Sequence, residues 1–142
     1  MKYFELNEFL HSDTARRKGI ENAPTFAQVD HLRELTKMIL DPLREAWGSS
    51  LKVTSGYRCQ SLNSAVGGSV SSAHLQGYAA DIVPTVGRLS DFVDFAERWL
   101  KANDIAFDQS IREKDRRGNE WWHIGIRNNA GQQRRQFLAL TK

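Results

Sequence analysis

Cysteine is nearly absent from this chain. Cys59 is the only cysteine among 142 residues, which excludes an internal disulfide and allows a reducing compartment. We interpret Cys59 as a small buried hydrophobic residue rather than a nucleophile. No apolar run approaches the length of a membrane span, so we expect no transmembrane segment. The first eight residues lack an apolar stretch and carry early acidic residues, so we expect no secretory signal there.

Neither sign of charge dominates the composition. Lys and Arg together number 20 and Asp and Glu 17, which gives a net charge of +3 at pH 7. This small excess mildly favours an anionic surface such as a cell wall or a nucleic acid. No helix-turn-helix or zinc-finger pattern is present, so we expect no nucleic-acid partner. The apolar fraction of 40% is ordinary for a globular protein, and we assign residues 1–142 to a single domain.

A first polar stretch lies where apolar residues would be expected. Residues 78–83 are typical of a strand, and alternate residues of a strand face the same way, so Asp81 shares a face with apolar neighbours. A carboxylate on such a face must be paired, hydrogen-bonded or metal-bound. Gly77 lets the chain turn, so that His74 can fold back over the strand. The alternative is a surface histidine beside an aspartate held by backbone N–H groups.

A second polar stretch, Glu120-Trp121-Trp122-His123, lies far downstream. Residues 122–126 are also typical of a strand, which places His123 among large apolar side chains. Taken alone, His123 is best interpreted as a core histidine bonded to a backbone carbonyl. Together, the two stretches offer two imidazoles, one carboxylate ligand and one spare carboxylate. Three N or O ligands with one open position form the usual arrangement of a catalytic zinc site.

This combination resembles a known family. Ser-x-His-x6-Asp followed by Glu-x-x-His, with aromatic residues before the second histidine, resembles the zinc D-Ala-D-Ala peptidases of the M15 family. That family includes D-alanyl-D-alanine carboxypeptidases and dipeptidases, and phage endolysins that cut cell-wall peptides. Ser55-Gly56-Tyr57-Arg58 also matches the Gly-Tyr-Arg segment of the family. The resemblance runs from about residue 53 to residue 126.

The resemblance implies a role for each matching residue. It implies that His74, Asp81 and His123 bind Zn²⁺. It further implies that Glu120 is the catalytic base and that Arg58 stabilises charge on the substrate. We expect four more residues to contact substrate or support the site: Ser72, Trp121, Trp122 and Tyr57. Either tryptophan could equally belong to the core.

The resemblance also implies an activity, the hydrolysis of peptidoglycan stem peptides that contain D-amino acids. The type that we expect is a D-alanyl-D-alanine carboxypeptidase, and the alternative is a phage-type cell-wall endopeptidase. A different class, a zinc-stabilised binding module without hydrolytic activity, has no need of a carboxylate such as Glu120 beside the metal. We expect a monomer that is made in the cytoplasm and acts at the cell wall, where release by a phage lysis system or delivery within a larger particle would bring it.

Hydrophobic periodicity predicts an α+β fold. Apolar residues recur at three- and four-residue steps over 25–47, with a kink or a break near Leu40 because Pro42 follows, and again over 88–101. Shorter helices are predicted at 12–19 and 59–65, and strands at 51–55, 78–83, 105–111, 121–126 and 135–140. We predict that the last two strands form a hairpin. The result is a small antiparallel sheet with helices packed on one face, and the resemblance implies a fold like that of hedgehog and D-Ala-D-Ala peptidase domains.

The spacing of Glu120 and His123 poses a geometric problem. Residues three apart in a regular strand point to opposite faces, yet a base and a ligand must serve the same metal site. We therefore predict that Glu120 lies in the turn after Gly118, or that a bulge near Trp121 redirects it toward the site.

Overall fold

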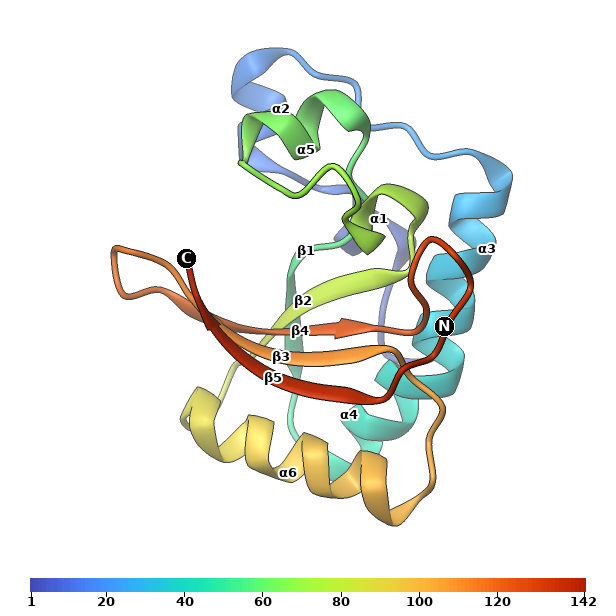
Figure 1. Cartoon of the computed structure of the whole chain (residues 1–142), viewed down its shortest axis with the longest axis vertical. Helices are drawn as coiled ribbons and strands as arrows, with labels where there is room; N and C mark the ends of the chain where they lie inside the picture. The colour runs from blue at the N-terminus through green and yellow to red at the C-terminus, as the bar shows by residue number, and fades with distance from the viewer.

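The computed structural model describes all 142 residues (Figure 1). The elements in chain order are α1 (Leu6–Leu10), α2 (Asp13–Lys18), α3 (Phe26–Leu35), the π-helical turn η1 (Thr36–Leu40), α4 (Asp41–Trp47), β1 (Leu51–Ser55), α5 (Gln60–Ala65), the 3₁₀ turn η2 (Ala73–Gln76), β2 (Ala79–Pro84), α6 (Leu89–Ala102), β3 (Gln109–Lys114), β4 (Glu120–Gly125) and β5 (Gln136–Thr141).

The long helical pattern forms as predicted, with its irregularity where proline requires one. Thr25 caps α3 by accepting a hydrogen bond from the backbone of Gln28, whose side chain caps in return. The helix continues through η1 into α4, and Gly48 ends α4 with a left-handed φ of 85°. Pro42 has no N–H to give to the preceding turn, and the chain widens into a π turn just before it. The irregularity predicted near Leu40, a kink or a break, takes the form of this π turn, through which the helix continues.

The sheet has five strands in the order β1-β2-β4-β3-β5, and all pairs are antiparallel except β3 with β5. The predicted hairpin of the last two strands is wrong. A tight turn joins β3 to β4, and β2 occupies the other edge of β4, so no edge of β4 remains for β5. The chain instead crosses over and adds β5 parallel to β3, with Gln109 opposite Gln136.

One face of the sheet packs on the helices. Ile82, Trp122 and Ile124 are fully buried there, in one core with residues of α3, η1, α4 and α6. The ring of Trp122 stands edge-on to Phe92 of α6, with 5.5 Å between ring centroids. Figure 1 shows α6 lying along one side of the sheet, with α2 and α5 together at the opposite side. The predicted α+β class with helices on one sheet face is confirmed, and the other face is left for polar residues.

Candidate metal centre

Asp81 and His123 lie directly opposite each other on neighbouring strands, β2 and β4, on the face away from the helical core. Gly77, with a φ of +73°, reverses the chain after η2 and so places His74 over the end of β2. One ligand atom from each of the three side chains lies within 4.8 Å of the others, and all three residues are buried. The structure therefore brings together the three residues that the sequence predicts as ligands.

His74 is held in one orientation by backbone groups. Its Nδ1 lies 2.7 Å from the carbonyl oxygen of Gly56, and a carbonyl can only accept, so Nδ1 carries the proton. Ser72 Oγ accepts a hydrogen bond from the backbone N–H of His74 at 3.2 Å and caps the η2 turn. Ser72 thus lies beside the cluster and supports His74 through the backbone.

The contacts inside the cluster need a cation. With its proton on Nδ1, the neutral His74 ring presents only a lone pair at Nε2, which lies 3.2 Å from Asp81 Oδ1. His123 Nδ1 approaches the same oxygen at 3.1 Å. A lone pair facing a carboxylate oxygen is repulsive unless a proton or a metal ion lies between them. Two imidazoles and one carboxylate are the donors that zinc takes in catalytic sites, so the donor set fits this ion.

Electrostatics favour the protonation states of His74 and Asp81 that metal binding needs. Burial lowers the pKa of His74 despite the opposing attraction of the Asp81 carboxylate. Burial alone would raise the pKa of Asp81, but the adjacent His74 and His123 outweigh it and hold that pKa well below its usual range. A neutral imidazole and an ionised carboxylate are the forms that bind metal.

Arg58 lies against the outer side of the cluster. Its Nη2 contacts the second oxygen of Asp81 at 3.2 Å, and its Nε and Nη1 donate to Ser55 and Asn63. A guanidinium has five N–H donors, so two remain after these three contacts. Arg58 therefore both fixes the metal-facing carboxylate and keeps donors available for a substrate.

Glu120 lies away from the cluster. β4 pairs with β3 in unbroken register from Glu120 to Gly125, so the predicted turn or bulge is absent and that geometric prediction is wrong. The turn before it is complete by Asn119, because the Asp115 carboxylate accepts N–H groups from residues 117 and 119. Glu120 consequently points to the sheet face opposite His123, where its carboxylate contacts Arg112 at 3.3 Å.

A second carboxylate, Glu113 on β3, was missed by sequence reasoning and lies on the correct face. It stands opposite Trp121, one side chain along from the pair formed by Ile111 and His123. Glu113 is buried, accepts a hydrogen bond from the indole N–H of Trp121, and lies 3.6 Å from Lys142 Nζ. A carboxylate that shares a strand face with an apolar residue, here Ile111, is the same kind of signal that singled out Asp81. It was missed because the strand was predicted to end at residue 111.

The two tryptophans have different surroundings, and Tyr57 lies away from the open face. Trp121 shares the open sheet face with His123 and lines a groove. Trp122 points the other way into the core, where its indole N–H donates to Ser110 Oγ at 2.8 Å. The Tyr57 ring also packs in the core, and burial raises the pKa of its hydroxyl. Neither Trp122 nor Tyr57 reaches the groove.

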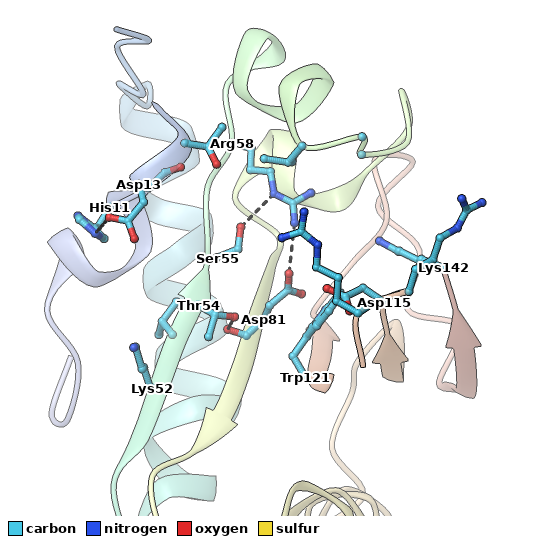
Figure 2. Close-up of a pocket in the computed structure, with 18 residues that line it drawn as sticks. His11, Asp13, Lys52, Thr54, Ser55, Arg58, Asp81, Asp115, Trp121 and Lys142 are labelled. Atoms are coloured by element: carbon cyan, nitrogen blue, oxygen red, sulfur yellow. Dashed lines mark hydrogen bonds and ion pairs between the residues drawn. The ribbon is translucent and has the colours of Figure 1, made fainter. Parts of the chain in front are cut away.

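Two hollows flank the cluster. The larger, of about 1060 Å³, is lined by Asp81, Arg58, Trp121, most of β1 and the turn between β3 and β4. Figure 2 shows Arg58 and Trp121 on either side of Asp81, with Lys52 and Lys142 farther out. The smaller, of about 380 Å³, is lined by His74, His123 and Glu113. A bound molecule could thus extend from the cluster in two directions.

A buried His-Asp-His cluster at the edge of a groove, on an α+β scaffold, is an arrangement found in single-metal hydrolases. The family model described as Peptidase M15 matches residues 2–115, which is most of the chain. The protein belongs to this family of zinc peptidases. The match includes His74 and Asp81 and ends before His123. A search of curated proteins found no match. None of the helices has both the length and the apolar character that crossing a membrane requires.

Proposed function

We propose that this protein is a zinc-dependent peptidase that hydrolyses peptide bonds in peptidoglycan stem peptides, with His74, Asp81 and His123 as the zinc ligands. The observation that carries the proposal is the convergence of one ligand atom each from His74, Asp81 and His123 within 4.8 Å of one another, with Nδ1 of His74 held by the Gly56 carbonyl so that Nε2 faces Asp81. Membership of the peptidase M15 family supports the class of reaction.

In this proposal the residues of the chain divide the work around the metal. Zinc, when bound, supplies Lewis acidity and lowers the pKa of water at the open position. Glu113 takes a proton from the attacking water at Oε1, since Oε2 accepts the indole N–H of Trp121, and returns the proton to the leaving amine. The two remaining N–H donors of Arg58 stabilise negative charge on the substrate.

Glu113 suits the role of base better than Glu120. Glu113 lines the same hollow as His74 and His123, whereas Glu120 lies on the other sheet face beside Arg112. The presence of a buried carboxylate on the site face also favours an enzyme over a zinc-stabilised binding module, which would need no base. The proposal thus keeps zinc-dependent peptide hydrolysis and moves the role of base from Glu120 to Glu113.

The D-alanyl-D-alanine carboxypeptidase type remains the proposed specificity. Arg58, permanently charged and adjacent to the metal ligands, is suited to holding the terminal carboxylate of such a substrate. One observation favours a second candidate, the cell-wall endopeptidase. Hollows on both sides of the cluster would accommodate a chain that continues past the scissile bond in both directions.

A digest of purified muropeptides by the zinc-loaded protein tests both candidates. Mass spectrometry that detects loss of a single terminal D-alanine supports the carboxypeptidase, and fragments cut within the stem or cross-link support the endopeptidase. Zinc binding without any cleavage would contradict the proposal and favour the binding module.

A further inference from the structure

The larger hollow is unusually polar and cationic for a peptide-binding groove. Only three of its 18 lining residues are hydrophobic. Five are Lys or Arg, namely Lys52, Arg58, Arg116, Arg117 and Lys142, and three are acidic, namely Asp13, Asp81 and Asp115. Peptide-binding sites more commonly rely on apolar pockets with few polar groups.

The three acidic residues are already engaged by the protein. Asp81 faces the metal ligands and Arg58. Asp13 pairs with His11 and Arg16, each at 3.2 Å. Asp115 is directed into its own turn, where three N–H groups donate to its carboxylate and lower its pKa. Asp81 thus offsets the charge of Arg58, and Asp115 is close enough to be influenced by the charge of Arg117, but none of the three forms an ion pair with Lys52, Arg116 or Arg117.

Three of the cations, by contrast, have no partner. Lys52, Arg116 and Arg117 are exposed, and their side chains form no ion pair or hydrogen bond within the protein. Lys52 stands on β1 and the two arginines on the turn between β3 and β4, so the charges border the groove on two sides. Figure 2 shows Lys52 on one side of Asp81 and Trp121, and Asp115, which immediately precedes the arginines, on the other.

We propose that this groove selects acidic peptides: Lys52, Arg116 and Arg117 bind carboxylate side chains of the substrate, outside the bond that is cleaved. The inference rests on the proposed function and deepens it by naming the substrate class. The planar fork of an arginine matches a carboxylate, and charges of one sign along a groove concentrate an oppositely charged ligand.

A substrate peptide fits these cations better than a wall polymer does. The three side chains border the same hollow as Asp81 and Arg58. The most concentrated basic run of the chain, residues 16–18 on α2, lies outside that lining. A surface that retained a polyanion would be expected to include this run.

The test uses zinc-loaded protein and two peptides that differ only in carrying Glu or Gln at the positions that flank the scissile bond on both sides. The variant Lys52→Gln/Arg116→Gln/Arg117→Gln should lose about tenfold in kcat/KM on the Glu peptide, as expected for three exposed charge contacts. The loss should appear in KM, stay below about twofold on the Gln peptide, and shrink as salt is added.

A matched control removes the same charge elsewhere. Lys18→Gln/Lys37→Gln/Arg98→Gln alters three exposed cations that lie outside the groove and form no ion pair. This control should cleave both peptides as the parent does. Equal losses on both peptides, or equal losses in the control, would overturn the proposal. So would weaker retention on isolated cell walls with unchanged peptide cleavage, because the cations would then serve a wall polymer.

Binding separates this inference from the proposed function. The zinc-loaded Glu113→Gln protein should bind the Glu peptide more tightly than the Gln peptide, by about the same factor, without turnover. A preference in binding by a protein that never cleaves would support the selection of acidic peptides by this groove and remove the peptidase assignment. Cleavage without any preference for the Glu peptide would support the peptidase assignment and exclude the selection of acidic peptides.

Discussion

Replacing Glu113 by Gln tests the residue on which sequence and structure differ most. Gln retains an oxygen that can accept the indole N–H of Trp121, so the buried hydrogen bond survives. The weak contact with Lys142, at 3.6 Å and half exposed to solvent, contributes little. We therefore expect the free energy of unfolding to change by no more than about 1 kcal/mol, and zinc content to stay normal. An amide cannot take the proton of a water, so turnover should fall by about 10²–10⁴-fold.

The matched variant is Glu120→Gln. Glu120 contacts Arg112 at 3.3 Å, and about a third of its side chain is exposed, so solvent screens the pair. Removing the charge should cost less than about 1 kcal/mol and leave turnover within about twofold of the parent. The two variants carry the same chemical change, Glu to Gln, on opposite faces of the β3–β4 pair.

The assay combines metal analysis, thermal unfolding and steady-state kinetics on a stem peptide, after both variants have been stripped of metal and reloaded with zinc. Full activity in the Glu113 variant together with an inactive Glu120 variant would return the role of base to Glu120. It would also mean that the regular pairing at the start of β4 is lost in the active protein. Full activity in both variants would exclude either carboxylate as the base.

Three further changes test the site and its scaffold. His123→Ala should abolish the rise in melting temperature that zinc gives the parent, since a ligand stabilises only the state that binds it; an undiminished rise would remove His123 from the site. Gly77→Ala should lower the free energy of unfolding, measured in urea, by more than about 1 kcal/mol, because φ is +73° and the added Cβ would lie 2.5 Å from the Gln28 carbonyl oxygen. An unchanged midpoint of the urea transition would contradict this. Burial raises the pKa of Glu97, so folding stability is lost as pH rises through that pKa and the carboxyl group ionises. Glu97→Gln stays neutral at every pH, so it should melt at a higher temperature than the parent at pH 7 but not near pH 4. Coincident melting curves at both pH values would refute the last expectation.

The full ligand set was predicted from the resemblance to the M15 family, and Asp81 alone gave a local signal of its own. Asp81 stands on an apolar strand face, and a buried carboxylate without a partner is too costly to occur by chance. The irregularity near Leu40 could also be predicted from the sequence, because the missing N–H of Pro42 acts within one helical turn. In both cases the decisive physics involves residues close together in sequence.

The pairing of β5 and the position of Glu113 could not be predicted in the same way. β5 can pair only with a strand that has a free edge. The turn between β3 and β4, and the pairing of β4 with β2 from far upstream, decide which edges are free. Glu113 was missed because strand boundaries are the least certain part of a periodicity argument. Extending β3 by three residues places Glu113 on the face of His123.

The segment Gly56–Arg58 forms a second layer that couples the ligands to one another. The Gly56 carbonyl fixes the His74 ring, the backbone N–H of Arg58 donates to the His74 carbonyl at 3.1 Å, and the Arg58 side chain holds Asp81. Gly56 itself lies so close to Phe9 of α1 that an added Cβ would lie 2.5 Å from a backbone oxygen, so the core supports this layer from behind. Any change at Arg58 would therefore disturb the orientation of a metal ligand as well as the charge offered to a substrate. Loss of activity in an Arg58 variant cannot separate these two roles. Glu113, whose polar partners are Trp121 and Lys142 and not the ligands, gives the cleaner measure of catalysis.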